Sequence, residues 1–296
     1  PLIPVPAPQD YHIHSTASPD GSSTMGAICL RAIELGIEEI GFAEHATFDP
    51  RDPYAELFDP VGYFDEIDYV RGRYGHQVII RAGLEVDYVP GYEGEIRTLL
   101  EDYPFDFVLG SVHIVEDEGG WANLAHEADC VGWFIARGER SAYLPYFKRL
   151  AQAVQSGLFD IIAHFDIVKW HGVGFYGPFQ AEIFAGEIES ILTAMVEHGI
   201  GLEINASGLF QPPAEPYPVP DIVQRYAAVG GTIVTVGSDA HHTTQVGQGI
   251  EGVISLARAS GIRHLTSFHQ RRAQPRPFTS FRLSTPTIEP EPFRWQ

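Results

Sequence analysis

Residues 10–21, DYHIHSTASPDG, place two histidines one residue apart where a short apolar run ends. Alternate side chains of an extended strand point to the same face, so His12 and His14 can reach one site together. Asp20 follows His14 by six residues and adds a carboxylate. A polar surface loop would carry the same residues. The other strands decide between a loop and a site, because only a site needs similar side chains at their ends.

Short β-type runs alternate with helical patterns along the chain. The predicted strands are residues 10–14, 37–45, 77–86, 105–113, 159–166, 200–208 and 231–239. Apolar residues with helical spacing lie between them, at residues 25–36, 92–103, 141–156, 181–199 and 219–229. This alternation predicts a single parallel α/β domain. The periodicity fits both a closed barrel and an open doubly wound sheet.

Side chains that can ligate metals fall at the carboxyl end of nearly every predicted strand. Besides His12 and His14, they are His45, Glu85, His113, His164, Asp239 and His241. Parallel α/β folds build their sites at this end of the sheet. An open sheet concentrates ligands at one switch point, so ligands on nearly every strand favour a barrel. Asp239 and His241 alternate as His12 and His14 do, which brings them to one face if the strand continues that far.

These eight residues and Asp20 supply imidazole nitrogens and carboxylate oxygens, which Zn²⁺, Mn²⁺ and Fe²⁺ accept as ligands. Without metal, such groups would be costly to bury together and would shift one another's pKa values. The two cysteines, Cys29 and Cys130, lie at none of these strand ends. The set is too large for one tetrahedral ion. The sequence therefore predicts two or three divalent transition-metal ions (Zn, Fe or Mn), bridged by a carboxylate or hydroxide.

The composition restricts the class of protein and of partner. At 296 residues with 44% hydrophobic side chains, the chain fits one α/β barrel with a full core. No apolar run approaches the ~18 residues of a membrane span, and the first residues lack a signal-peptide pattern. With only two cysteines, this predicts a cytoplasmic protein. The net charge of −20 argues against nucleic-acid polymers and membranes as partners, and leaves the oligomeric state open.

Seven motifs occur in the order found in the polymerase and histidinol phosphatase (PHP) family. They are DYHIH…D, EH, GLEVD, GSVH, AHFD, LEINASG and GSDAH, between residues 10 and 268. The chain most resembles the monofunctional histidinol-phosphatase branch of that family. The resemblance implies a distorted (β/α)7 barrel, similar to a TIM barrel, with a trinuclear site at the carboxyl ends of its strands. It also implies hydrolysis of L-histidinol phosphate to L-histidinol and phosphate, a reaction of histidine biosynthesis.

The resemblance also implies how the ligands are shared among three ions. The first ion would be held by His12, His14, Glu85 and Asp239; Glu85 would bridge to a second, held by His113 and His164; and the third would take Asp20, His45 and His241. Some family members have histidine at the position of Asp20, so the third site differs from theirs. A hydroxide bridging the two ions that share Glu85, and held there with His113 and His164, would attack phosphorus directly.

Other polar residues are candidates for contacts with substrate. They are Lys169, Glu203, Asn205, His171 and His242. Each has a structural alternative: Lys169 would pair with a carboxylate, Glu203 and Asn205 would hydrogen bond inside the barrel, and the two histidines would lie on the surface. Asp166 would orient a metal-bound imidazole as a hydrogen-bond acceptor, or cap the following turn.

Two segments fall outside the repeated pattern. Residues 115–133 form an acidic insertion, which we interpret as a lid or an elaborate loop. A Pro- and Arg-rich tail, residues 271–296, follows a barrel domain of residues 1–270. Two other functions remain open. One is a phosphoesterase for mononucleotides or other small phosphate esters, and the other is a metal-binding module without activity.

Overall fold

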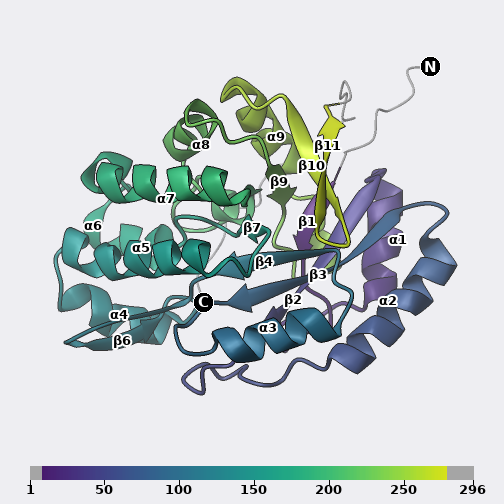
Figure 1. Ribbon diagram of the computed structural model, residues 1–296, viewed down its shortest axis with the longest axis horizontal. Coiled ribbons are helices and arrows are strands. Elements are labelled where there is room, and N and C mark those ends of the chain that lie inside the picture. Colours follow the sequence, from purple (N-terminus) through teal and green to yellow (C-terminus); the bar gives the residue numbers. More distant parts are fainter. Residues whose placement is uncertain (1–8, 279–296) are drawn as a thin grey trace, which may run out of the picture.

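The computed structural model describes residues 9–278, and its centre is one sheet of seven parallel strands (Figure 1). In spatial order these are β1 (Asp10–Ile13), β2 (Glu39–Ala46), β3 (Ile79–Asp87), β4 (Phe107–Ser111), β7 (Ile161–Ile162), β8 (Gly201–Asn205) and β9 (Val234–Gly237). Each predicted strand corresponds to one of these. Most of their residues are buried, as expected for parallel strands that are covered on both faces.

The two outer strands, β1 and β9, meet and nearly close the sheet into a barrel. Ile13 forms an isolated parallel bridge with Ala240, and the His14 amide donates to the Ala240 carbonyl at 2.8 Å. The buried Asp10 carboxylate accepts hydrogen bonds from the Ser238 amide and hydroxyl and from the Gly247 amide. We call this junction the closure seam. It confirms the predicted barrel and excludes an open sheet.

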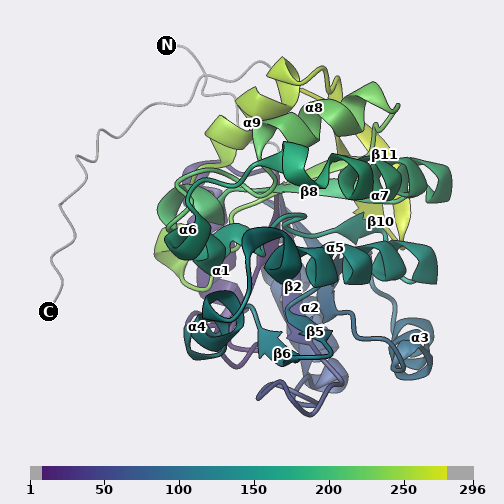
Figure 2. The ribbon, with the colours of Figure 1, turned by 90° about the vertical axis from the view of Figure 1, so that its left-hand side faces the viewer.

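Helices surround the barrel, as Figures 1 and 2 show from two sides. They are α1 (Met25–Leu35), α2 (Pro60–Tyr74), α3 (Glu93–Asp102), α4 (Glu127–Ile135), α5 (Glu139–Ser156), α6 (Lys169–Tyr176), α7 (Ala185–His198), α8 (Pro220–Ala228) and α9 (Ile250–Ala259). Three short 3-10 turns accompany them, η1 (Ala181–Phe184), η2 (Ser207–Phe210) and η3 (Thr243–Gln245). Helices α2, α4, α6 and α9 have no counterpart among the predicted elements. No helix within residues 9–278 combines the length and apolarity needed to cross a membrane.

The inside of the barrel below the site is filled by a small apolar cluster. Its buried members are Tyr11, Ala43, Phe107, Leu109, Ile161, Ala163 and Phe268. Two glycines make room for its largest ring, because a Cβ at Gly41 or Gly83 would lie 2.6 Å or 2.2 Å from Phe107 Cζ. This packing closes the barrel beneath the polar residues at its carboxyl end.

An antiparallel hairpin, β10 (His264–His269) with β11 (Arg272–Pro277), packs at the opposite, amino-terminal end of the barrel. Its Ser267 hydroxyl donates to the buried carboxylate of Glu39 at 2.6 Å, and Arg276 pairs with the same carboxylate. The hairpin spans the domain boundary predicted at residue 270, and β11 belongs to the predicted tail. Residues 279–296 of that tail lie outside the described part of the chain.

The acidic insertion has regular structure. It forms a hairpin, β5 (Ile114–Asp117) with β6 (Gly120–Asn123), followed by α4. Arg149 of α5 anchors the hairpin through the Ile114 carbonyl and the Glu116 carboxylate. The Asn123 amide donates to Asp52 at 2.8 Å. The insertion is therefore fixed against the barrel next to the carboxyl ends of the strands.

Candidate metal centre

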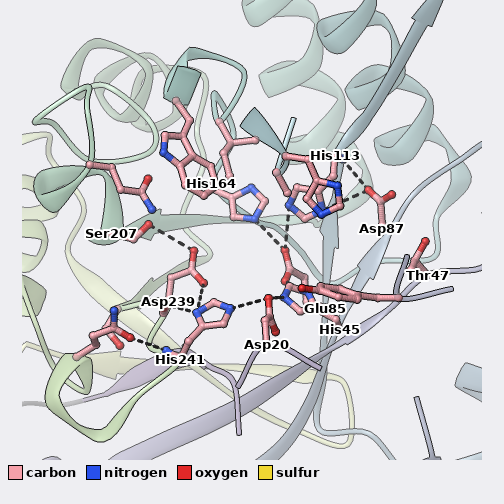
Figure 3. A pocket seen from close by; sticks show the side chains of 18 of the residues that line it. Asp20, His45, Thr47, Glu85, Asp87, His113, His164, Ser207, Asp239 and His241 are labelled. Carbon is pink, nitrogen blue, oxygen red and sulfur yellow. Dashed lines mark hydrogen bonds and ion pairs between the residues drawn. The ribbon is translucent and has the colours of Figure 1, made fainter. Parts of the chain in front are cut away.

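A cavity of about 410 Å³ opens at the carboxyl ends of the strands (Figure 3). Seven of the nine predicted ligands line it: Asp20, His45, Glu85, His113, His164, Asp239 and His241. The other two, His12 and His14, are fully buried beneath it and contact the same carboxylates. The structure therefore brings all nine side chains to one place, although their role as ligands stays a prediction.

The residues predicted for the first ion form a buried ring. His12 Nε2 lies 3.4 Å from Glu85 Oε2 and 3.6 Å from Asp239 Oδ1. His14 Nε2 lies 3.6 Å and 3.4 Å from the same two oxygens. His12, His14 and Asp239 also offer ligand atoms that all lie within 4.8 Å of one another, close enough for one cation.

The second group shares Glu85 with the first. His164 Nε2 lies 2.8 Å from Glu85 Oε1, and His113 Nε2 lies 3.9 Å from the same oxygen. His12, Glu85 and His164 again offer atoms that could hold one ion. The two oxygens of Glu85 thus face different sets of imidazoles, which is the arrangement a bridging carboxylate needs.

The third group lies toward the cavity opening. Asp20 Oδ2 is 3.3 Å from His45 Nε2 and 3.4 Å from His241 Nε2, so this carboxylate joins strands that are far apart in the sequence. The His14 ring stacks between them, with ring centroids 4.2 Å from His45 and 4.3 Å from His241. Some family members have histidine at the position of Asp20, and the structure places this carboxylate with the other two residues of the group.

Several buried nitrogens in the site have no hydrogen-bond partner among the described residues. They are His12 Nε2, His14 Nε2 and His164 Nδ1. A buried polar atom without a partner is costly, and a cation at the centre of each group would satisfy the two Nε2 atoms. The donor set is imidazole and carboxylate without sulfur, which fits divalent zinc, iron or manganese. The residues present therefore fit the predicted metals.

The carboxylates of the site are held anionic, whereas its imidazoles divide into two kinds. Burial opposes protonation of His12 and His45, yet the facing carboxylates raise the pKa of both imidazoles well above the usual range. Burial opposes ionisation of Glu85, but the His12 and His45 imidazoles outweigh it and hold the pKa of Glu85 well below its usual range. Burial opposes ionisation of Asp239 too, yet its imidazole neighbours, His12 first, keep its pKa low. Burial lowers the pKa of His113 to about 4. Charged carboxylates and a neutral imidazole are the states in which these groups bind cations.

The backbone brings Asp239 and His241 into the site differently from the prediction. β9 ends at Gly237, and Asp239 has a φ of 57°, in the left-handed region that non-glycine residues rarely adopt. Strand alternation therefore does not extend to residue 241. The His241 ring is held instead by its Nδ1, 3.0 Å from the Asp239 carbonyl oxygen. His164 also departs from strand geometry, with a φ of 24° directly after the two-residue strand β7.

Two candidates for substrate contact, Glu203 and Asn205, lie below the cavity. Both are fully buried, and neither lines the cavity. Glu203 Oε1 is 2.6 Å from His12 Nδ1, and the Asn205 amide donates to Glu203 and to Asp239, each at 3.2 Å. Neither side chain faces the cavity, and their contacts are the internal hydrogen bonds that were weighed as the alternative to substrate contact.

Lys169 and Asp166 are likewise turned away from the site. Lys169 is fully buried and its Nζ donates to Asp166 at 3.0 Å and to the Pro216 carbonyl at 2.8 Å. The same oxygen, Asp166 Oδ2, also accepts the Val219 amide at 2.9 Å. Neither residue contacts a site imidazole in these hydrogen bonds. Their pairing fixes the segment after β8 to the start of α6, because a buried lysine needs a carboxylate partner.

The remaining histidine candidates do not line the cavity. His171, in α6, stacks on Trp170 with ring centroids 4.7 Å apart, and His242 is an exposed cap of η3. His126, which the sequence analysis did not select, lines the cavity from the start of α4. Three aromatic side chains that it also missed, Tyr54, Trp170 and Phe210, lie on the cavity wall. Tyr54 comes from a turn, Trp170 from the start of α6 and Phe210 from the end of η2, where no periodic pattern marks a site.

Two further buried carboxylates support predicted ligands. They lie in the motifs GLEVD and EH, but the sequence predicted no role for them. The Asp87 carboxylate accepts the His113 amide at 2.7 Å. Glu44 accepts the Ser18 hydroxyl at 2.6 Å, and that hydroxyl oxygen accepts the His45 amide at 3.0 Å. Asp87 lies two residues after Glu85 on the same face of β3, whereas Glu44 directly precedes His45 on β2, so strand alternation marks only Asp87.

The PHP domain model matches residues 10–207 of the chain. A probable histidinol-phosphatase of Deinococcus radiodurans is 30% identical over 274 residues, covering 90% of this chain and 98% of that protein. The histidinol-phosphatase of Lactococcus lactis is 28% identical over 88% of this chain and 93% of its own length.

Solved structures show the same fold. The histidinol phosphate phosphatase of Lactococcus lactis, crystallised with zinc, L-histidinol and phosphate, superposes with a TM-score of 0.82 at 24% identity. It covers 91% of this chain and all of the other. A putative histidinol phosphatase of Listeria monocytogenes superposes with a TM-score of 0.75 at 25% identity, over 82% of this chain and 99% of its own.

Proposed function

The chain belongs to the PHP domain family, and on that premise we propose that it is a phosphomonoesterase that hydrolyses L-histidinol phosphate to L-histidinol and phosphate. Relatives with the name histidinol-phosphatase match nearly their whole length. The single observation that carries the proposal is the convergence at one cavity of three groups of potential ligands, two with a carboxylate and one made of the imidazoles of His14, His45 and His241. The reaction would belong to histidine biosynthesis.

The charge of the cavity explains why a phosphate ester would need metal there. Five carboxylates line the cavity (Asp20, Asp52, Glu85, Asp87 and Asp239), while no lysine or arginine of residues 9–278 does. A phosphate dianion would be repelled by such a wall. Two divalent ions, held as the ligand groups predict, would offset most of this negative charge, and three would reverse its sign. We propose zinc, iron or manganese in these positions.

The ions would supply Lewis acidity, which lowers the pKa of water and neutralises the charge of the phosphoryl oxygens. The chain's own residues would do the rest. Glu85 would keep two metal positions at a fixed separation, because its Oε1 faces His164 and its Oε2 faces His12. The rigid strand ends hold the reacting groups in place, which removes the entropic cost of bringing them together.

The outer part of the cavity suits the organic half of the substrate. Tyr54, Trp170 and Phe210 offer flat apolar surfaces on which an imidazole ring can stack. Asp52 adds a carboxylate to the same cavity, which favours the ammonium group of histidinol over an anionic leaving group. A mononucleotide lacks that ammonium group and carries a larger base.

The proposal is tested by phosphate release from protein that is stripped of metal and reconstituted separately with zinc, manganese and iron. Histidinol phosphate, adenosine monophosphate, an aryl phosphate and a phosphodiester are compared at equal concentration. We expect kcat/KM for histidinol phosphate to exceed that for the others by about 10²-fold or more. Preferred turnover of the mononucleotide would assign the other phosphoesterase function. Release from none of the four with all metals would indicate a module without activity.

A further inference from the structure

We propose that Glu203 is a positioning residue that holds the first and second metal positions in a fixed relation. We also propose that the absence of a side chain at Gly237 makes room for its carboxylate. This inference rests on the metal site of the proposed function. Glu203 lies on β8, the strand between β7 and β9, which contributes none of the nine predicted ligands. It is fully buried and does not line the cavity.

One oxygen of Glu203 fixes the state of a first-ion ligand. Glu203 Oε1 lies 2.6 Å from His12 Nδ1, so the proton of the imidazole stays on Nδ1. The lone pair is then on Nε2, which has no hydrogen-bond partner within residues 9–278 and lies 3.4 Å from Glu85 and 3.6 Å from Asp239. A carboxylate in this place also makes the imidazole a stronger donor to a cation.

The other oxygen of Glu203 contacts the second group through the backbone of His164, and the first group through the side-chain amide of Asn205. Glu203 Oε2 accepts the His164 amide at 2.8 Å, at a residue whose φ of 24° needs such support. The same oxygen accepts the Asn205 amide at 3.2 Å, and Asn205 also donates to Asp239 at 3.2 Å. One carboxylate is thus joined to ligands that follow β7 and β9 as well as to His12 on β1.

Gly237 gives an independent reason to assign a positioning role to the contact between Glu203 and His12. A Cβ at this position of β9 would lie 2.4 Å from His12 Cβ and 2.6 Å from Glu203 Oε1. Any larger residue would therefore push the carboxylate and the imidazole apart. The backbone of Gly237 is regular strand, so the absence of a side chain serves this contact and no turn.

The decisive variant is Glu203→Gln, which keeps the shape of the side chain. A glutamine cannot accept at both ends, so its amide nitrogen must face either the His12 N–H or the His164 and Asn205 donors. Metal-free protein is titrated with zinc against a chromophoric chelator. We expect two of the three zinc affinities to fall about 10- to 100-fold, while the third, held by Asp20, His45 and His241, stays as in the wild type.

The matched control is Glu39→Gln, because Glu39 is an equally buried carboxylate at the opposite end of the barrel. It should leave all zinc affinities unchanged. Gly237→Ala should reproduce the zinc pattern of Glu203→Gln with the carboxylate intact, and serves if Glu203→Gln does not fold. In both site variants kcat should fall while KM stays near the wild-type value, since Glu203 touches no substrate.

Two results would overturn the inference. One is wild-type zinc affinity at every position in Glu203→Gln. The other is an equal loss at all positions together with a lowered melting temperature of the metal-free protein, which would mean a purely structural role. Zinc titration involves no substrate, so failure of the histidinol-phosphate assignment would leave this test standing.

Discussion

Glu85 has the most contacts with imidazoles of any side chain in the site. Its Oε2 lies 2.9 Å from His45 Nδ1 and its Oε1 lies 2.8 Å from His164 Nε2, with His12, His14 and His113 within 4 Å of one oxygen or the other. A residue placed in this way cannot be exchanged without affecting several ligands together.

We therefore expect Glu85→Gln to remove two equivalents of metal and to lower kcat by more than about 10²-fold, because an amide offers one neutral oxygen where two charged ones are needed. Elemental analysis of protein purified without chelator, combined with phosphate release, measures both quantities. Glu39→Gln serves again as the buried control. A variant that keeps its metal but loses activity would show that Glu85 acts on substrate and does not bridge ions.

Trp170 should determine binding of the organic half of the substrate. It lines the cavity and is held by its stacking on His171. Replacing it with alanine should raise KM for histidinol phosphate by about 10-fold and change kcat little, because the ring contacts substrate equally in the ground and transition states. Steady-state kinetics separate the two constants. Trp121→Ala, at a half-exposed tryptophan outside the cavity, is the control. An unchanged KM would place the imidazole elsewhere.

At the scale of elements, the C-terminal hairpin fastens the amino-terminal end of the barrel. β11 pairs with β10 over six residue pairs, and Arg276 pairs with Glu38 and Glu39 before and at the start of β2. Truncation after Gln270 removes β11 and should lower the free energy of unfolding by about 1–3 kcal/mol. Zinc affinity should stay unchanged, because the site lies at the other end. Chemical denaturation and zinc titration give the two values, and lost metal binding would move the domain boundary beyond the hairpin.

The turn of the same hairpin provides a test by pH. Arg271 Nε donates to Asp160 at 2.8 Å. Burial raises the pKa of Asp160 and Arg271 opposes that rise. When a carboxyl group has a higher pKa in the folded than in the unfolded state, the protein loses stability as the pH rises from the unfolded-state pKa toward the folded-state pKa.

Arg271→Gln should raise the folded pKa of Asp160 further and extend this loss to higher pH. The variant should be less stable than the wild type by about 1–2 kcal/mol at pH 7, and the difference should shrink below about pH 4, where Asp160 is protonated in both states. Urea unfolding across this pH range measures the difference. A difference independent of pH would mean that the Leu158 carbonyl, the other Arg271 acceptor, dominates.

Elements were predictable where periodicity was strong. All seven strands of the barrel follow from apolar runs that end in polar residues, and the barrel itself from the ring of ligand types. Helix α2 was missed although Asp59 caps it, Pro60 begins it, and Tyr63, Ile67 and Val70 form its buried stripe, because polar residues surround that stripe. The hairpin of β10 and β11 was missed because two prolines in β11 argue against a strand, and they are tolerated here at a sheet edge.

Within the site, the ligand positions were predictable and the roles of their neighbours were not. Ligands recur at strand ends, which the sequence displays directly. Glu203 was predicted to contact substrate because its strand supplies no ligand. Only the closed barrel shows that its carboxylate contacts His12, which lies 191 residues away in the sequence. Burial decides between a residue that supports a ligand and one that faces the cavity, and burial depends on the tertiary fold.

For the whole molecule, metal and stability should be linked. The folded chain gathers nine ligand groups that the unfolded chain does not hold together, so an ion bound at 1,000 times its Kd would add about 4 kcal/mol to the free energy of unfolding. Dialysis against a chelator should therefore lower the melting temperature by several degrees, and zinc should restore it. Equal melting temperatures with and without metal, at full metal occupancy, would contradict the predicted site.

The closure seam has a consequence for the time at which the site can form during synthesis. The Asp10 carboxylate can accept its hydrogen bond from the Ser238 amide only after that residue, 228 positions further along the chain, has been synthesised. A ribosome that adds 5–20 residues per second needs roughly 10–45 s to make that segment. Throughout this interval His12 of β1 and the following His14 lack Asp239, so the nascent chain has only part of the predicted cation site. Complete binding of an ion at the predicted first position would therefore begin only after β9 and Asp239 have been synthesised.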